Sequence, residues 1–443
     1  MDFTDPVLIG IVGILVLFIL LAAGVHIALA LGIVGMVGTI AITGFNAALV
    51  LYTARFFYSI ADFGFIAIPL FIFMGTLAGT SGLGQRLYQS AHLWLNRVPG
   101  GLGVATVGSC AAFGVVTGSS LVCASVFAKI SAPEMRRFGF DKSMAYGICA
   151  SGGVIGMLIP PSLLMVTFGI ISELSIGRLL IAGISPGIIL TLLFSIGIVV
   201  ISHFRPSSTG SGAEPVFATW RQRFYSLIPL WPFLVVGIIV IGGLFGGVFG
   251  PSEAAAVGAV ALTVITLIIL GLDNGWKMVN KAVRETVPIA AMVFMILACA
   301  AIFGRFLVLS RITPTVLDFV IQLGLSKLAF LIAVAMVYLV MGCFLDAISI
   351  QSITLPTIMP IIYALNIEPM WFAMVACMAI EIGLITPPVG LNIFAVQAVA
   401  EADVSLEDIV RGIFPFFLMM CAAEVLLIAI PWLSTFLPNV MLD

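Results

Sequence analysis

The chain has 443 residues, of which 62% are hydrophobic and only 9% are charged, and its formal net charge is −2. Soluble domains carry about 25% charged residues, so this composition excludes a soluble globular protein and is typical of a polytopic membrane protein. Seven cysteines and three histidines are scattered along the sequence, and no basic tract is present. The sequence therefore favours neither a metal cluster, nor a catalytic triad, nor a nucleic-acid partner.

The first hundred residues read as scaffold helices. Apolar runs long enough to span a bilayer occupy residues 6–23, 27–45 and 63–80. The mixed segments at 46–62 and 84–101 contain aromatic and basic residues, which is typical of helices that lie at a membrane surface. We therefore expect residues 1–101 to form scaffold helices with an interfacial arm.

Residues 102–132 are long enough to span, but small and polar residues interrupt the middle of the run. This pattern favours a re-entrant hairpin whose tip is Gly118-Ser119-Ser120, a structure allowed at membrane depth only when protein or water shields it. One continuous helix with small residues at a packing interface is the alternative.

Residues 143–171 are interrupted by two adjacent prolines within the motif GMLIPPS at 156–162. Proline lacks an N–H donor and clashes with the carbonyl four residues earlier, so Pro160 and Pro161 free the carbonyls of Gly156 and Met157. Such carbonyls must be buried in protein, face a cavity or bind a ligand. The range 102–175 is thus expected to form the first part of a transport core.

Residues 176–328 return to scaffold character. Further spans are predicted at 179–201, 227–249, 254–270 and 288–309. A Ser- and Gly-rich stretch makes 203–224 a flexible cytoplasmic linker, and 313–325 is expected to be an interfacial helix.

The second half repeats the hairpin and the break. Residues 329–361 form a second hairpin candidate with its tip at 342–346, and 370–400 contain the motif GLITPPV. Pro387 follows Pro160 by 227 residues, and Gly383 follows Gly156 by the same distance. The range 329–400 is therefore predicted to be the second part of the core, and 401–443 a C-terminal helix.

The placement of Lys and Arg predicts the orientation. With the amino terminus outside, thirteen of the 18 basic residues face the inside, and the two broken segments cross in opposite directions. The predicted fold is an all-α polytopic membrane protein, an inverted-repeat elevator-type transporter with two re-entrant hairpins and two broken helices.

Four motifs together resemble one known family. They are GVVTGSS at 114–120, PEM at 133–135, SGG at 151–153 followed by IPPS, and GLITPPVG at 383–390. In this order they resemble the large membrane subunit of tripartite ATP-independent periplasmic (TRAP) transporters. The resemblance implies sodium-driven import of a small organic acid across the bacterial inner membrane by an elevator motion. It also implies a small four-helix membrane subunit and a soluble periplasmic binding protein, with no enzyme activity and no organic cofactor.

Two or more sodium ions are expected where the hairpin tips meet the breaks, because freed carbonyls beside half-helix ends suit cations. The predicted ligands are Ser119, Gly156, Ile159 and Ser162 for one ion, and Gly342, Gly383, Thr386 and Val389 for the other. Plain proline kinks, capped by neighbouring helices, are the alternative.

The cargo is expected between the two tips. The candidate substrate ligands are Gly118, Ser119, Ser120, Arg305, Asp346 and Asn392. Arg305 either holds a carboxylate through two parallel hydrogen bonds or extends to the membrane interface. Asp346 either contacts the cargo or is instead an ion-linked or tip-ordering residue, and Glu381 and Glu424 are expected to be paired structurally.

Other function classes remain open at this point. A stand-alone sodium/divalent-anion symporter would have a similar architecture but no binding protein. An intramembrane enzyme would need a base near Ser119 or Ser120, and no His or Lys lies at a matching depth. An anion channel is the third alternative.

Overall fold

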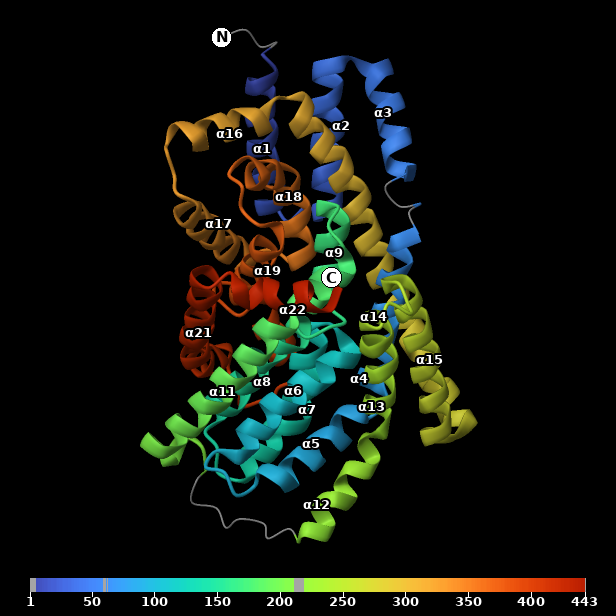
Figure 1. The fold of residues 1–443 in the computed structure, drawn as a ribbon, viewed down its shortest axis with the longest axis vertical. Helices are drawn as coiled ribbons and strands as arrows, with labels where there is room; N and C mark the ends of the chain where they lie inside the picture. The colour runs from blue at the N-terminus through green and yellow to red at the C-terminus, as the bar shows by residue number, and fades with distance from the viewer. Residues whose placement is uncertain (1–4, 59–60, 62, 211–218, 443) are drawn as a thin grey trace.

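The computed structural model describes residues 5–58, 61, 63–210 and 219–442, and these are overwhelmingly helical (Figure 1). In this part of the chain the only β-type pairing is one isolated bridge between Phe140 and Thr209. The all-α prediction is confirmed. Residues 211–218, in the predicted linker, and residues 1–4 lie outside the described residues.

The helices of the first half lead from the scaffold into a hairpin and a broken helix. They are α1 (Pro6–Ala22), α2 (Ile27–Thr43), α3 (Phe45–Tyr58), η1 (Phe63–Ile66), α4 (Ala67–Thr80), α5 (Leu83–Leu95), α6 (Gly101–Thr117), α7 (Ser120–Arg137), α8 (Lys142–Leu158), α9 (Leu163–Ser172), α10 (Ile176–Ala182) and α11 (Ile184–Phe204).

The second half follows the same plan after a segmented helix over Trp220–Phe245, which is one of the candidate membrane spans. Its elements are η2 (Pro206–Ser208), α12 (Trp220–Leu227), η3 (Ile228–Leu230), α13 (Trp231–Gly237), η4 (Ile238–Gly242), α14 (Gly243–Phe245), α15 (Pro251–Leu309), α16 (Ile312–Gln322), α17 (Lys327–Gly342), α18 (Ala347–Ala364), α19 (Pro369–Leu384), α20 (Leu391–Gln397), α21 (Leu406–Ala429) and α22 (Trp432–Leu442).

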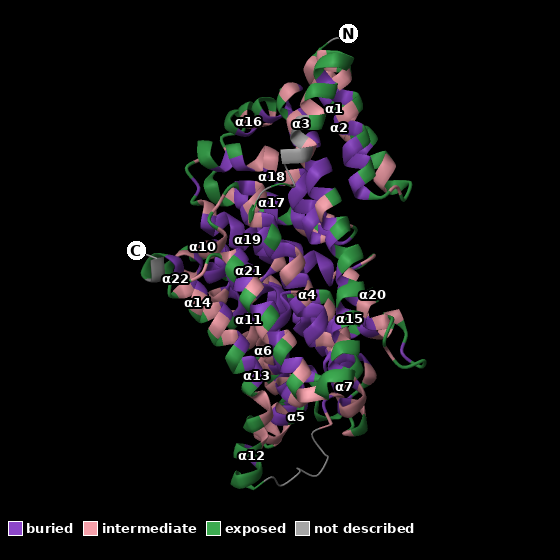
Figure 2. Ribbon diagram, turned by 90° about the vertical axis from the view of Figure 1, so that its right-hand side faces the viewer, coloured by how far each residue is buried: buried purple, intermediate pink, exposed green. Residues whose placement is uncertain are grey.

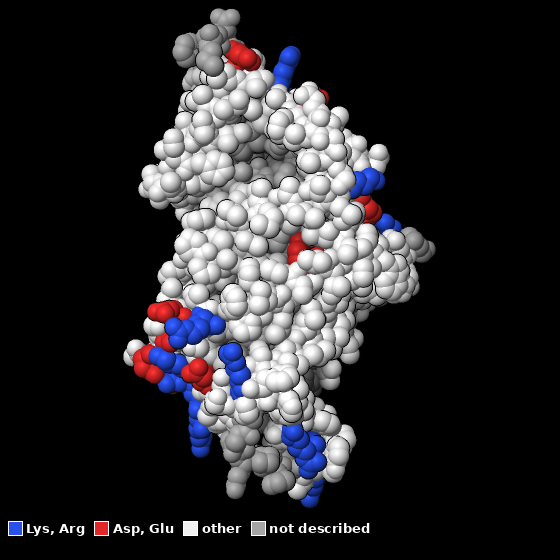
Figure 3. Space-filling view, turned by 90° about the vertical axis from the view of Figure 1, so that its left-hand side faces the viewer, with Lys and Arg blue, Asp and Glu red and all other residues white. Residues whose placement is uncertain are grey.

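The outer surface suits a bilayer. Among the described residues, six helical segments are long and apolar enough to cross a membrane, and the bent pair α8–α9 would make a seventh. Large apolar side chains such as Leu15, Ile33 and Ile196 are exposed. Figure 3 shows a face that is mostly uncharged, with acidic and basic side chains at its top, edges and lower end and one acidic patch near its middle. The protein is therefore a polytopic membrane protein, as the composition predicts.

Two scaffold segments gain detail from the structure. The segment expected to be an interfacial arm forms α3, which packs against α2 and α15 and runs beside α2 in Figure 1. Helix α15 consists of two helices that meet at a kink, in keeping with the separate spans expected at 254–270 and 288–309. The one bend inside α15 is at Gly271, where φ is 76° and ψ is 164°, a conformation that glycine adopts readily.

The core consists of two interlocked copies of one unit. In the first, the hairpin α6–α7 packs on α8, and in the second the hairpin α17–α18 packs on α19. The short second part of each broken helix packs on the hairpin of the other copy, so that α9 lies against α18 and α20 lies against α7. Figure 2 shows the most continuous burial in this central region. Each hairpin is therefore shielded by protein, as a re-entrant loop requires.

Candidate ion and substrate sites

The tip of the first hairpin lies directly against the first break. The backbones of Gly114 and Gly156 are so close that a Cβ atom on Gly114 would be 2.7 Å from the Gly156 Cα. The Gly118 carbonyl accepts a hydrogen bond from the Leu163 N–H at 3.2 Å. Gly118 has φ +58°, and a side chain there would collide with the Pro161 carbonyl. Only glycine fits this turn.

The second hairpin meets the second break in the same way. A Cβ atom on Gly342 would lie 2.7 Å from the Gly383 Cα. The Cys343 carbonyl accepts hydrogen bonds from the Val389 and Gly390 N–H groups, each at 3.2 Å. The pairing of a hairpin glycine with a glycine of the broken helix thus occurs twice, at positions related by the sequence repeat.

The helices break where the proline pairs stand. Helix α8 ends at Leu158 and α9 begins at Leu163, with a bend of 45° between them. Helix α19 ends at Leu384 and α20 begins at Leu391. The Pro160–Pro161 and Pro387–Pro388 peptide bonds are both cis.

Hydroxyl groups lie at these half-helix ends. The Ser119 Oγ accepts from the Val122 N–H at 3.5 Å, and the Ser162 Oγ accepts from the Met165 N–H at 3.3 Å. Both contacts are long, and a hydroxyl has two lone pairs, so each oxygen retains capacity for a further partner. The Thr386 hydroxyl donates to the Ile382 carbonyl at 2.6 Å, which leaves its lone pairs available.

Asp346 orders the second tip. Its carboxylate caps α18, accepting from the Ile348 N–H at 3.1 Å and the Ser349 N–H at 3.2 Å, and it also accepts from the Ser349 hydroxyl. An N-cap of this kind satisfies backbone donors that would otherwise be orphaned in the membrane. The geometry matches the tip-ordering alternative.

Ser120 faces the other half of the core. It is buried, and its hydroxyl donates to the Glu381 Oε1 on α19 at 3.5 Å. The structural pairing expected for Glu381 is thus present, although the Glu381 Oε2 has no hydrogen-bond partner among the described residues. Within the same described part, neither carboxylate oxygen of Glu424 and neither side-chain amide atom of Asn392 has a partner, and both residues are buried.

A small cavity lies at the first tip. Its volume is about 60 Å³, and it lies between Gly118 and Ser119 on one side and Gly75 and Thr76 of α4 on the other. Ligand pockets usually measure roughly 300–1,000 Å³. This cavity therefore has room for an ion and water but not for an organic acid.

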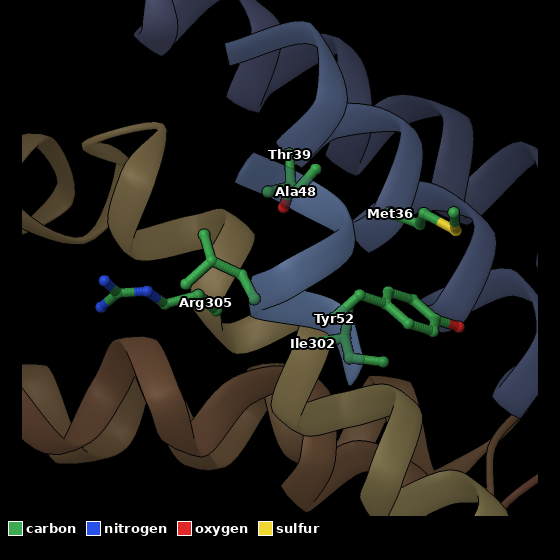
Figure 4. A pocket seen from close by; sticks show the side chains of 7 residues that line it. Met36, Thr39, Ala48, Tyr52, Ile302 and Arg305 are labelled. Atoms are coloured by element: carbon green, nitrogen blue, oxygen red, sulfur yellow. The ribbon is translucent and has the colours of Figure 1, made fainter. Parts of the chain in front are cut away.

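A much larger cavity, of about 440 Å³, lies between the core and the scaffold. Its walls come from the end of α9, from α15 and from α18, and its polar lining includes Glu173, Arg305 and Ser352. Arg305 also borders a narrow space beside α2 and α3. Figure 4 shows its guanidinium pointing away from Met36, Thr39 and Tyr52 of that space. The Arg305 Nε and the Ser352 Oγ are buried and have no hydrogen-bond partner within the part of the chain that the structure describes.

The predicted substrate residues do not form one site in this conformation. Gly118 and Ser119 line the small cavity, and Arg305 lines the large one. Leu163 borders the first and Ile170 the second, and seven residues of helix rise by about 10 Å. The two cavities thus lie towards opposite ends of α9.

Polar residues on α18 were absent from the predicted sites. Gln351 is buried; its Oε1 accepts from the Thr167 hydroxyl at 2.7 Å and its Nε2 donates to the Leu164 carbonyl at 3.0 Å. Ser352, which lines the large cavity, follows it. Polar residues in an apolar membrane segment mark functional positions by default, and this signal would have identified both.

The chain matches a known family over nearly its whole length. Residues 14–433 match the family described as the tripartite ATP-independent periplasmic transporter, DctM component. The C4-dicarboxylate TRAP transporter large permease protein DctM of Pseudomonas aeruginosa is 32% identical, over 87% of this chain and 88% of that protein. The ectoine TRAP transporter large permease protein TeaC of Halomonas elongata is 31% identical, over 84% and 85%.

Two further comparisons agree with this family and with the fold. The sialic acid TRAP transporter permease protein SiaT of Haemophilus influenzae is 29% identical over 88% of this chain and 62% of that protein. The solved Alcanivorax borkumensis YdaH transporter shares the fold, with a TM-score of 0.61 at 14% identity over 89% of this chain and 90% of that one. The chain belongs to the DctM family and is a large membrane subunit of a TRAP transporter.

Proposed function

We propose that this protein is the permease of a sodium-coupled importer of a small organic acid and that it works by an elevator motion. The observation that carries the proposal is the doubled contact between a hairpin tip and a broken helix, Gly114 with Gly156 and Gly342 with Gly383. Named relatives transport C4-dicarboxylates, ectoine and sialic acid, which supports a small acid as cargo.

Sodium would bind where each tip meets its break. The hydroxyls of Ser119 and Ser162, with main-chain oxygens of Gly156 and Ile159, provide a neutral oxygen set for one ion. Thr386 and main-chain oxygens of Gly342, Gly383 and Val389 provide the second. Neutral oxygens beside half-helix ends suit Na⁺. Each ion would tie a hairpin tip to a broken helix and fix the shape of the core.

The cargo would occupy the cavity of about 440 Å³ beside Arg305. A guanidinium binds a carboxylate through two parallel hydrogen bonds, and the unpartnered Arg305 Nε is available for one of them. The walls of the cavity belong to the hairpin-bearing core on one side and to α15 on the other. Motion of the core against α15 would therefore carry the cargo away from Arg305 and release it.

The family implies the partners and the location. We propose a small four-helix membrane subunit, a soluble periplasmic binding protein that delivers the acid, and a place in the bacterial inner membrane with the amino terminus periplasmic. The excess of Lys and Arg on the predicted inner face supports this orientation.

Reconstitution tests the proposal. The permease and its small subunit are placed in proteoliposomes, and uptake of labelled succinate, ectoine and sialic acid is measured with the binding protein present. We expect uptake of at least one acid to require both an inward sodium gradient and the binding protein. Equal uptake with choline in place of sodium contradicts the coupling. Sodium-driven uptake without the binding protein supports the stand-alone symporter instead.

A further inference from the structure

The large cavity between core and scaffold carries one positive and one negative side chain. Arg305 comes from α15, and Glu173 follows the end of α9, so the two charges belong to different walls. The third polar group is the hydroxyl of Ser352 on α18, which is fully buried and has no hydrogen-bond partner among the residues described. The rest of the lining is apolar, including Ile170, Leu297 and other side chains.

Helix termination does not explain the glutamate at position 173. Glu173 is the C-cap of α9 and has φ 57°, in the left-handed region, and its N–H donates to the Gly169 carbonyl. Glycine or asparagine usually occupies such a position, because other side chains adopt it with strain. Arg311 and Asn366 adopt the same conformation elsewhere in the described chain, so the backbone alone does not assign a role to Glu173. What distinguishes Glu173 is its position, since this exposed carboxylate lines the cavity that Arg305 also lines.

The charges discriminate between classes of acid. A dicarboxylate bound to Arg305 would bring a second negative charge into a cavity that Glu173 also lines, and juxtaposed like charges exclude wrong partners from a site. A cargo that carries one carboxylate and one cationic nitrogen could bind Arg305 on one wall and Glu173 on the other. The cavity, at about 440 Å³, is within the usual range for small-molecule pockets.

We infer that the cargo is a zwitterionic acid whose carboxylate binds Arg305 and whose cationic nitrogen binds Glu173. This inference rests on the proposed function, since it names the class of acid that the same cavity carries. Glu173 is then the specificity-determining residue, and Arg305 is the anchor common to all acids.

Two probes of equal chain length test the inference. Succinate and 4-aminobutyrate share a four-carbon chain with a carboxylate at one end, and they differ only in the charge at the other. Their binding to the purified permease with its small subunit is measured in sodium buffer by ligand-induced thermal shift, without the binding protein. We expect 4-aminobutyrate to bind roughly tenfold more tightly than succinate, and Glu173→Lys to reverse that order.

Matched variants identify the source of the preference. Asp273→Lys makes the same charge change at the exposed bend of α15, away from the cavity, and should leave the ratio of the two affinities unchanged. Arg305→Ala should weaken both probes. If Glu173→Lys does not fold, Glu173→Gln replaces it and should bring the two affinities together.

The possible failures are distinguishable. Tighter or equal binding of succinate by the wild-type protein, binding of neither probe, or a ratio that does not change in the Glu173 variants would overturn the inference. The proposed function would stand in each case, provided that sodium-driven acid uptake is observed in proteoliposomes. Acid uptake into proteoliposomes that does not depend on sodium would contradict the proposed function itself.

Discussion

The glycines at the hairpin tips set the geometry of the core. Gly114, Gly156, Gly342 and Gly383 allow two backbones to approach more closely than any side chain would permit. The backbone of each broken helix therefore lies next to a hairpin tip, which is the arrangement that the proposed ion sites require.

Gly114→Ala should therefore disable transport. Its Cβ would be placed 2.7 Å from the Gly156 Cα, and backbone cannot rotate away as a side chain can. We expect a loss of about 1–3 kcal/mol in stability and a fall of more than tenfold in the uptake rate. Gly108→Ala on the same helix is the matched control, because nothing lies within 4 Å of its Cβ position. Similar rates for the two variants would show that close approach is not required.

Arg305 should matter for its shape as well as its charge. Lysine retains the charge but cannot form two parallel hydrogen bonds with a carboxylate. Arg305→Lys is expected to raise the KM for the acid roughly tenfold. Arg311→Lys, at an exposed position six residues later, is the control. An unchanged KM in Arg305→Lys would favour the alternative in which Arg305 extends to the membrane interface.

At the scale of elements, the two copies of the repeat unit hold each other through crossed contacts. Gln351 joins α18 to α9, and on the related side the Ser125 hydroxyl donates to the Ala395 carbonyl at 3.4 Å, joining α7 to α20. A hairpin of one copy thus supports the broken helix of the other, and this contact would couple the two proposed ion sites.

Gln351→Leu tests the contact between α18 and α9. The change removes two buried hydrogen bonds and leaves the Leu164 carbonyl without this donor, so we expect a loss of about 1–3 kcal/mol in stability. Sodium should also become less effective in promoting acid binding. Ser125→Ala removes the 3.4 Å contact to Ala395 and a 2.8 Å bond to the Leu121 carbonyl within α7. It should have a smaller effect, because only the longer contact joins two elements. A larger effect of Ser125→Ala in the thermal unfolding assay would contradict the assignment.

A charged cluster joins α7 to the turn before α21. Arg136 donates to the two Asp403 oxygens at 2.9 and 2.7 Å and also to Glu401. The hydrogen bond from Arg136 lowers the pKa of the Asp403 carboxyl below its ordinary value. A depressed pKa gives a stabilisation that is present above the ordinary carboxyl pKa and is lost as the pH falls through the lowered value.

Asp403→Asn should therefore lower the Tm, and by the same amount at every pH above 5, where the wild-type carboxyl is fully charged. The decrease should be small, because the cluster is exposed. The difference from the wild-type protein should shrink with added salt and disappear in acid, where the wild-type carboxyl is also neutral. A difference in Tm that grows as the pH falls below the ordinary carboxyl pKa would contradict the predicted direction of this pH dependence.

The sequence predicts the elements of the core better than their neighbours. Adjacent prolines and clustered Gly and Ser identify both breaks and both tips, because backbone chemistry is local. The packing of α3 beside α2 was not predicted, since its aromatic residues suit a membrane interface and a helix groove equally. The sequence analysis assigned Arg305 and Ser119 to one site, whereas the structure places them in different cavities. The sequence could not show this, because it does not reveal which distant helices contact each other.

At the scale of the whole molecule, the account requires the core to move against the scaffold. A Cβ on Gly304 of α15 would lie 3.4 Å from the Pro356 Cβ of α18, close to the separation that a disulfide spans. In a background lacking other cysteines, Gly304→Cys with Pro356→Cys should form a crosslink that blocks uptake by more than tenfold, and a reductant should restore it.

A crosslink inside the core is the control for that experiment. The Cβ position of Gly152 lies 3.7 Å from the Cys110 Cβ, and both residues belong to the first half of the core. A disulfide between Cys110 and the cysteine of Gly152→Cys should hardly change the uptake rate, because both residues move together. Adding a reductant should therefore have little effect on uptake. Full transport by the Gly304–Pro356 crosslinked protein would rule out a relative motion of α15 and α18.

Simultaneous flux of sodium and acid tests the central claim most directly. Labelled Na⁺ and labelled acid are followed into the same proteoliposomes, with the small subunit and the binding protein present. Two oxygen-lined ion sites predict that at least two sodium ions enter with each acid and that Gly114→Ala loses both fluxes together. Entry of the acid with no accompanying sodium would contradict the account.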